Sequence, residues 1–278
     1  MNDNFNLTKQ MFNSSCISDY MGCPRLFYYT FIRRLVQKEV KTSMNFGKVF
    51  HEVLLEWYRS GDVEKASSLF AQLPSLITVD LIRKEWGESI FKQYVERYKT
   101  EIGKTLNLEV KFRVEIGERI YAGTIDRIED WGGQIYVDDH KTSSRLELSD
   151  HSHRPSPQLD GYCFACRELM GSCQGAIING ISTAKNPKER FIRFPSSRTD
   201  KEMDGWKEIF TDTTDDMMRD VERKHFPKHT SYCNRWGKCK FWELCVYGED
   251  ERYIEQNFNI DEEKEEEVSD GRGTNEKK

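Results

Sequence analysis

Helical spacing of apolar residues marks three segments in the first part of the chain. From Asn45 onward, apolar side chains recur at the i, i+3, i+4 and i+7 positions that line one face of a helix. These are Phe46, Val49, Phe50, Val53, Leu54, Trp57 and Tyr58. A second helix is predicted over residues 79–98. The aromatic-rich segment 14–35 is also predicted to be helical, with a break at Cys23-Pro24.

The apolar periodicity then changes to two. Residues 108–116 alternate between apolar and polar positions, and residues 119–128 and 134–139 read as two further strands. Alternation predicts half-buried β-strands, and Trp131-Gly132-Gly133 supplies a turn between the last two strands. We therefore expect a three-stranded meander in the middle of the chain.

Both kinds of pattern occur in the rest of the chain. Residues 158–170 predict a helix, residues 175–183 and 190–195 predict two strands, and residues 201–224 predict a long final helix. Helices that alternate with strands in this order are typical of the α/β fold class. The patterns together predict a mixed β-sheet flanked by helices.

Composition and hydropathy restrict the class of protein. Hydrophobic residues make up 37% of the chain and charged residues 32%, which is typical of a globular protein with a polar surface. No apolar run approaches the roughly 18–20 residues that a membrane span needs. The polar first residues lack the hydrophobic core of a signal peptide, so we expect a cytoplasmic protein that does not bind membranes.

The formal net charge of -5 is unevenly distributed. Residues 261–278 contain eight acidic and four basic residues, a net of -4, which leaves -5 + 4 = -1 for the rest of the chain. A nucleic-acid-binding protein of this charge needs a local basic groove. Candidates for part of such a groove are Arg25, Arg33, Arg34, Lys38 and Lys41, although each could equally belong to a solvated helix face.

Two aspartates near the ends of successive predicted strands are candidate metal ligands. Strands in a hairpin lie about 4.8 Å apart, so the carboxylates of Asp126 and Asp139 can converge on one cation. Oxygen ligands suit Mg²⁺ or Mn²⁺. Lys141 lies two residues after Asp139 and shares its sheet face, whereas Asp138 should point the other way. Taken alone, an Asp-x-Lys triplet is more often a surface ion pair.

These residues resemble the active site of the PD-(D/E)XK nuclease superfamily, in its RecB-like exonuclease branch. The resemblance lies in Asp126 followed by Asp139-His140-Lys141-Thr142, in the helical Gly47-x-x-x-His51 before the sheet, and in Gln158-x-x-x-Tyr162 after it. It implies a restriction-endonuclease-like core and a cation held by His51, Asp126, Asp139 and His140. It also implies that Lys141, Gln158 and Tyr162 complete the catalytic site. Without the resemblance, His51 reads as a partly buried structural histidine and Gln158 and Tyr162 as amphipathic packing.

Eight cysteines in a cytoplasmic chain favour metal or cluster ligation over disulfides. Cys163, Cys166 and Cys173 lie in or beside a helical apolar pattern and are predicted to be core residues. Cys233, Cys239 and Cys245 do not fit such a pattern, and three thiolates need a fourth ligand. Cys23, far upstream, is the obvious candidate for it.

The same nuclease branch includes members with one cysteine before the core and three after it, which together ligate a [4Fe–4S] cluster. By this resemblance Cys23, Cys233, Cys239 and Cys245 would hold such a cluster. Many of those members have two residues between the first two downstream cysteines, where this chain has five. Zinc therefore remains the alternative, with His229 or Cys16 as a substitute ligand.

The predicted organisation has four parts. They are an N-terminal helical arm at 1–44, a nuclease core at 45–200, a helix and cysteine-rich segment at 201–250 joined to the first arm by the cluster, and an acidic, disordered tail at 251–278.

The resemblance implies a metal-dependent exonuclease that acts on single-stranded or end-bearing DNA in recombination, repair or phage DNA processing. A protein partner from recombination, repair or replication is possible. The alternatives are a non-cleaving DNA-binding or assembly protein of the same fold, a DNA-end processor of CRISPR adaptation, or a zinc-stabilised interaction protein.

Overall fold

The structure is a computed structural model that describes residues 11–38, 42–72, 79–100, 103–146, 156–235 and 237–261. The chain divides into two compact units. The unit that we call the arm unit comprises Met1–Glu39, Arg113–Ala122 and Lys207–Lys278. The unit that we call the site unit comprises Val40–Phe112 and Gly123–Trp206.

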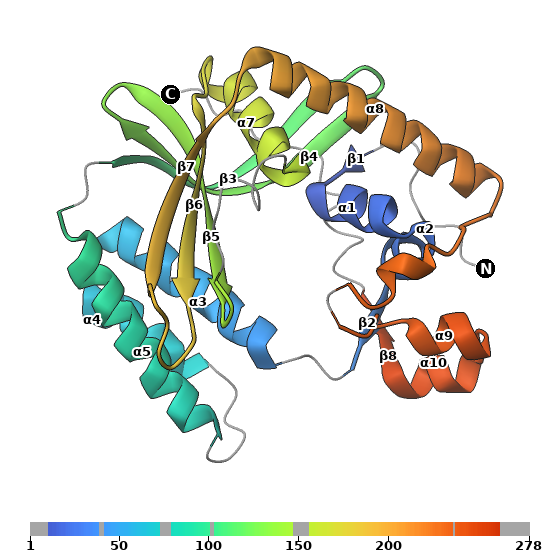
Figure 1. Cartoon of the computed structure of the whole chain (residues 1–278), viewed down its shortest axis with the longest axis horizontal. Helices are drawn as coiled ribbons and strands as arrows, with labels where there is room; N and C mark the ends of the chain where they lie inside the picture. Colours follow the sequence, from blue (N-terminus) through green and yellow to red (C-terminus); the bar gives the residue numbers. More distant parts are fainter. Residues whose placement is uncertain are drawn as a thin grey trace. The chain divides into compact units, whose positions relative to one another are not determined.

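The central elements are a group of helices, a three-stranded meander, one helix and a pair of strands (Figure 1). They are α3 (Thr42–Ser60), α4 (Val63–Ser68), the 3₁₀ helix η3 (Leu69–Gln72), α5 (Val79–Tyr98), β3 (Lys104–Ile116), β4 (Arg119–Trp131), β5 (Gln134–Ser143), α7 (Pro157–Met170), β6 (Gly175–Ser182) and β7 (Phe191–Ser197). The N-terminal elements are β1 (Met11–Phe12), α1 (Ser14–Gly22), α2 (Pro24–Phe27), the π-helix η2 (Tyr28–Ile32) and β2 (Leu35–Gln37). The C-terminal elements are α8 (Asp200–Glu222), η4 (Thr230–Tyr232), α9 (Trp242–Tyr247), α10 (Glu251–Asn257) and β8 (Phe258–Ile260).

The main sheet is mixed. Its strands follow the order β1-β4-β5-β6-β7, with β3 also paired to β4. Strand β5 is antiparallel to β4 and parallel to β6, and β6 is antiparallel to β7. The parallel pair requires a crossover connection, and α7 provides it. The predicted α/β class with a mixed sheet flanked by helices is therefore confirmed.

The turn between β4 and β5 also agrees with its prediction. Gly132 and Gly133 have φ angles of 62° and 88°, in the left-handed region that favours glycine. A short turn aligns the two strands antiparallel, with Arg127 opposite Asp138. This register decides which side chains of the two strands meet.

The core of the site unit lies between the sheet and helices α3, α4 and α5. The apolar stripe predicted from Asn45 onward is buried at Phe50, Val53 and Leu54, and it packs against Phe91 of α5 and Ile181 of β6. Helix α3 also passes close to β5, because a Cβ atom built on Gly47 would lie 3.1 Å from the Thr142 Oγ1 atom. The absence of a side chain at this position lets the helix approach the strand.

An N-terminal and a C-terminal segment of the described chain pair in the arm unit. Strand β2 pairs antiparallel with β8, so that Leu35 lies opposite Ile260. Around this pair, residues of α2, η2, α9 and α10 form one hydrophobic cluster, which includes Tyr29 of η2, Ile254 of α10 and Phe241, the residue before α9. Ordered structure therefore continues past the predicted boundary of the tail at residue 250. Residues 262–278 of that tail lie outside the described residues.

The N-terminal helical segment is shorter than the apolar pattern predicted. The break at Cys23-Pro24 is present, but Leu35 belongs to a strand, because the chain leaves the helix at Arg34, whose φ is 52°. Every described helix is too short or too polar to span a membrane.

Candidate active site

Asp126 and Asp139 occupy facing positions on β4 and β5. The β4–β5 register ends at the pair of Arg127 with Asp138, and the two aspartates come directly next to that pair on the two strands. The backbone N–H of His140 donates a hydrogen bond to Asp126 Oδ2 at 2.9 Å. The hairpin thus brings two carboxylates to one face of the sheet, where the sequence placed them.

Lys141 connects this carboxylate pair to helix α7. Its Nζ lies 2.9 Å from Oδ1 and 2.8 Å from Oδ2 of Asp139, and it donates to Gln158 Oε1 at 3.4 Å. The amide of Gln158 in turn donates to the Tyr162 hydroxyl at 3.2 Å. Gln158 and Tyr162 share a helix face because they are four residues apart. Asp139, Lys141, Gln158 and Tyr162 therefore form one continuous chain of contacts.

His51 approaches the site from helix α3. Its Nδ1 lies 3.7 Å from Asp126 Oδ2, and its side chain is 34% exposed. The position follows from the close approach at Gly47, one helical turn earlier, which sets α3 beside the end of β5. His51 can therefore reach the carboxylates and remains accessible to solvent.

The two carboxylates of Asp126 and Asp139 are not fully compensated by neighbouring positive charge. Burial raises the pKa of Asp126 to about 6, and the negative charge of Asp139 adds to the effect, whereas His51 and the His140 N–H oppose it. Burial alone would lower the pKa of Lys141, but the adjacent Asp139 outweighs burial and raises it, so Lys141 stays protonated. One ammonium faces two carboxylates, and a divalent cation would offset the difference.

The imidazole of His140 meets this group at one residue, since its ring lies edge-on to that of His51 with ring centroids 5.8 Å apart, and its other contacts lie elsewhere. Its Nδ1 lies 2.9 Å from Asn179 Nδ2, and its ring stacks on Tyr58 with ring centroids 5.9 Å apart. Burial holds its pKa well below the usual range, so the ring is neutral. Successive residues of a strand point to opposite faces, which separates His140 from Asp139. Only the main chain of His140 contacts Asp126.

A buried ionic cluster lies on the same face as His140. Arg127 contacts Glu129 at 2.9 Å and Asp138 at 3.1 Å, and all three side chains are at most 1% exposed. The guanidinium also lies 4.1 Å from the ring centre of Tyr58. We predicted that Asp138 would face away from Asp139, and it does. The role of Arg127 and Glu129 was missed, although their spacing of two along β4 places them on one face.

The four cysteines proposed as cluster ligands meet in the arm unit. Cys23, Cys233, Cys239 and Cys245 line one cavity of about 270 Å³, together with His229. Burial raises the pKa of Cys239 and Cys245, and the neighbouring cysteines add to the effect.

The remaining cysteines lie elsewhere. Cys16 does not line this cavity, because its thiol donates to the Asn13 carbonyl at 3.1 Å. Cys163, Cys166 and Cys173 are buried in the site unit, as predicted.

Neither the carboxylates with His51 nor the four cysteines have the full geometry of a metal site. Among the residues that the structure describes, no group of three or more His, Cys, Asp or Glu side chains is arranged to hold a metal ion. The candidate active site has its carboxylates and imidazole adjacent, and the cysteine cavity has its thiols around one space. Both sets have the donor chemistry of a metal site without its full geometry.

Three of the basic residues predicted to form a groove in the N-terminal arm are bound to C-terminal residues instead. Arg25 and Arg33 form ion pairs with Glu249 at 3.3 and 3.0 Å, and Lys38 donates to the Glu255 carbonyl at 2.6 Å. These partners come from the C-terminal segment, which the sequence pattern did not connect to the arm. Lys41 lies outside the described residues.

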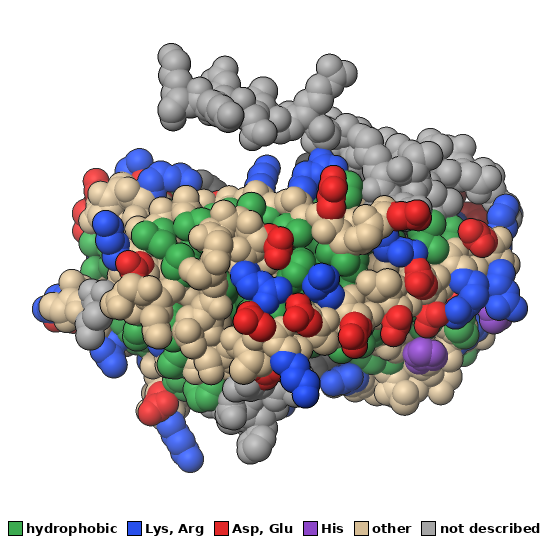
Figure 2. Space-filling model, turned by 90° about the horizontal axis from the view of Figure 1, so that it is seen from above, with side chains coloured by type: hydrophobic (Ala, Val, Ile, Leu, Met, Phe, Trp, Pro, Cys, Tyr) green, Lys and Arg blue, Asp and Glu red, His purple; other side chains and the backbone are tan. Residues whose placement is uncertain are grey.

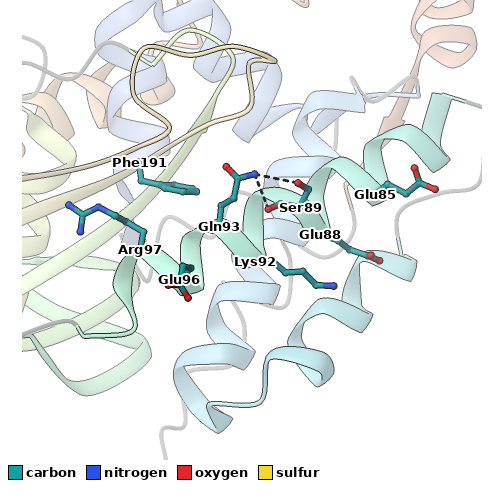
Figure 3. A pocket seen from close by; sticks show the side chains of 8 residues that line it. All are labelled: Glu85, Glu88, Ser89, Lys92, Gln93, Glu96, Arg97 and Phe191. Atoms are coloured by element: carbon teal, nitrogen blue, oxygen red, sulfur yellow. Dashed lines mark hydrogen bonds between the residues drawn. The ribbon is translucent and has the colours of Figure 1, made fainter.

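A surface hollow of about 800 Å³ lies away from the predicted site. It runs along α5, where Glu85, Glu88 and Glu96 line it, and it ends at Phe191 of β7 (Figure 3). None of the residues predicted to be catalytic lines it. Three glutamates on this wall make it a poor surface for a polyanion.

The chain has matches among solved structures and among protein families. A crystal structure described as "Putative exonuclease" from Eubacterium rectale is 14% identical, with a TM-score of 0.54 over 90% of this chain and 93% of that one. The crystal structure of SSO0001 is 13% identical, with a TM-score of 0.35 over 87% of this chain and 88% of that one. No curated protein matches. The model of the PD-(D/E)XK nuclease superfamily matches residues 12–246, and the chain therefore belongs to that superfamily.

Proposed function

We propose that this nuclease is a Mg²⁺- or Mn²⁺-dependent DNA exonuclease of the RecB-like branch. The observation that carries the proposal is the group formed by Asp126, Asp139 and Lys141, with both carboxylates on one face and the ammonium within 2.9 Å of Asp139. Carboxylates with a neighbouring ammonium are the groups that phosphodiester hydrolysis needs.

Asp126, Asp139 and His51 are the residues proposed to hold the cation. Their oxygen and imidazole donors fit Mg²⁺ or Mn²⁺, and a cation bound by both carboxylates would offset the burial and the Asp139 charge that raise the pKa of Asp126. A bound divalent cation activates water and stabilises charge on the phosphate. The neutral imidazole of His140 is directed elsewhere, so we propose that its main chain, by its hydrogen bond to Asp126, orients that ligand.

Lys141 and the α7 residues complete the proposed catalytic group. Lys141 keeps its proton, so it can stabilise negative charge that develops on a phosphate oxygen. Gln158 contacts Lys141 directly, and Tyr162 contacts Gln158, so the two α7 residues hold the lysine from the helix side. We propose that they position the lysine against Asp139 and contact the substrate strand.

The substrate that we propose is DNA with a free end or in single-stranded form. Recombination, repair or phage DNA processing would supply such ends and would also supply a protein partner. All eight cysteines are free thiols, which fits a reducing, cytoplasmic setting.

End dependence is the direct test of the proposed exonuclease. With Mn²⁺, the enzyme should degrade a linear single-stranded DNA and leave a covalently closed circle of the same sequence intact over the same time. Products are followed by gel electrophoresis, with EDTA as the inactive control. Equal loss of linear and circular DNA would show endonuclease activity instead. Tight binding with no loss of either would favour a non-cleaving DNA-binding protein.

We also propose that Cys23, Cys233, Cys239 and Cys245 hold a [4Fe–4S] cluster. The four thiols line one cavity. Iron–sulfur clusters are held by cysteine thiolates alone, whereas zinc sites often include histidine, so a set of four thiols favours the cluster. His229 lines the same cavity, which keeps zinc as the alternative, because an imidazole can replace one thiolate in a zinc site. In either case the group would tie residues near both ends of the arm unit together and so stabilise it.

Protein purified without oxygen should show absorption at about 400 nm, the colour of an iron–sulfur cluster. Cys239→Ser should lose this absorption and unfold at a lower temperature, because one of four ligands is missing. Cys16→Ser is the matched control, since Cys16 lies outside the cavity, and it should keep the colour. Colourless wild-type protein that contains only zinc would overturn the iron–sulfur assignment.

A further inference from the structure

The hairpin loop between β6 and β7, residues 183–190, is held in one shape from within. Arg190 donates from Nη1 to the carbonyls of Ser182 and Ala184 at 2.9 and 2.8 Å, and from Nη2 to the Lys185 carbonyl at 3.2 Å. Its guanidinium also lies 4.9 Å from the ring centre of Trp86. Three charge-assisted bonds to backbone oxygens make this a fixed loop.

The loop begins where β5 ends, close to the candidate catalytic residues. Ser143, the last residue of β5, pairs with Ser182, and the Thr183 N–H donates to the Ser143 carbonyl at 2.9 Å. Asp139 lies four residues before Ser143 along the strand. At about 3.3 Å per residue, the base of the loop is therefore about 13 Å from Asp139. A stacked strand of about four nucleotides, which rises about 3.4 Å per nucleotide, covers this length.

Exposed cations gather at this end of the sheet. Lys185 and Lys188 project from the loop, Arg145 follows β5, and Lys48 lies on α3 next to the contact of Gly47 with Thr142. None of the four side chains has an ion-pair partner among the described residues. Glu189 is the single acidic residue within the loop.

Two other surfaces, on α5 and α8, carry mixed or acidic charge. The hollow along α5 is lined by three glutamates against Lys92 and Arg97 (Figure 3). Helix α8 contains nine acidic and three basic residues. On the face shown in Figure 2, acidic side chains are interspersed with Lys and Arg side chains. The cations of the β6–β7 loop, which follows the strand paired with that of the candidate catalytic residues, therefore distinguish this loop from α5 and α8.

We propose that Lys185 and Lys188, together with Arg145 and Lys48, form a track that binds the phosphates of the DNA strand leading to Asp139 and Lys141. This inference rests on the proposed function and adds the path of its substrate. Lysine side chains bind phosphates as point charges without reading bases, so the track is independent of sequence. The loop is held by Arg190, which keeps the two lysines in place before the strand arrives.

Salt-dependent binding tests the track without any cleavage. Binding of a fluorescent oligothymidylate is measured by anisotropy in EDTA over a range of salt concentrations. Each phosphate contact to a single strand contributes about 0.7 to the slope of log K against log salt. The double variant K185A/K188A should therefore lower the slope by about 1.4, and it should weaken binding about 25-fold at 0.1 M salt.

Two further variants make the result specific. K92A/K201A removes the same charge from exposed positions outside the track, on α5 and α8, and should bind like wild type. K185R/K188R keeps the charge and should restore binding. A K185A/K188A variant with the wild-type slope, or wild-type protein that does not bind the oligonucleotide, would overturn the track. The nuclease proposal is judged separately, by cleavage in Mn²⁺, so a protein that binds through the loop but never cleaves would retain the track and lose that proposal.

Discussion

Asp139→Asn is expected to lower the rate of DNA hydrolysis by about a thousandfold or more. Asp139 is the residue that links the two halves of the proposed site, because it faces Asp126 across the hairpin and accepts two contacts from Lys141. An amide keeps the shape of the side chain but removes the charge that a cation and the lysine both require. Loss of one group of this kind typically costs several kcal/mol of transition-state stabilisation.

The rate is measured on end-labelled linear DNA in Mn²⁺, with circular dichroism to show that the variant is folded. Asp130→Asn is the matched control, because Asp130 lies on the same hairpin but accepts its hydrogen bond from the turn, at Gly133 N. That variant should keep its rate within a few-fold. If Asp139→Asn degrades DNA at the wild-type rate, the assignment of Asp126, Asp139 and Lys141 as the active site is wrong.

Arg127→Met is expected to cost the folded protein about 3–5 kcal/mol, the usual effect of removing one partner from a buried ionic group. Glu129 and Asp138 would be left without their cation at sites with almost no exposure. Burial already raises the pKa of Asp138 well above its usual range, and Glu129 adds to this, whereas Arg127 opposes both. Without the arginine, these carboxyls must fold in their neutral forms.

This loss of stability has a characteristic pH dependence. A carboxyl whose pKa is higher in the folded than in the unfolded state costs stability at neutral pH, and the cost disappears as the pH falls toward the unfolded value, near 4. Arg127→Met should therefore regain part of its lost stability when the pH is lowered from 7 to 5. Urea unfolding at the two pH values measures this.

A triple variant separates charge from packing. Arg127→Met combined with Glu129→Gln and Asp138→Asn removes the uncompensated charges and should recover much of the lost stability, because the whole ionic group is then absent. A loss below about 1 kcal/mol for Arg127→Met alone would contradict the view that these charges depend on one another.

The buried cluster also bears on the active site through β5. Along β5, Asp138 and His140 alternate with Asp139 and Lys141 and point to the opposite face. His140 and Arg127, the ion-pair partner of Asp138, pack on Tyr58. This packing also fixes the backbone that carries Asp139 and Lys141. The alternation means that the proposed catalytic face and the buried ionic face share one strand. A change on the buried face can therefore shift the proposed catalytic residues without contacting them.

Much of the fold follows from local periodicity alone. The stripe from Phe46 to Tyr58 predicted α3, and the alternation from residue 108 onward predicted β3, because a helix and a strand expose one face every 3.6 and every two residues. The short elements were missed. Strands β2 and β8 have three residues each, and they pair with each other although they lie far apart in the sequence.

The sequence by itself determined which chemical groups the candidate site contains and that Asp139 and Lys141 share a face, because the period of a strand is a property of the backbone. Only the tertiary structure decided that His140 turns to Asn179, that Arg25 and Arg33 are paired with Glu249, and that four cysteines surround one cavity. These outcomes depend on which distant residues burial brings together, and no local pattern encodes that choice.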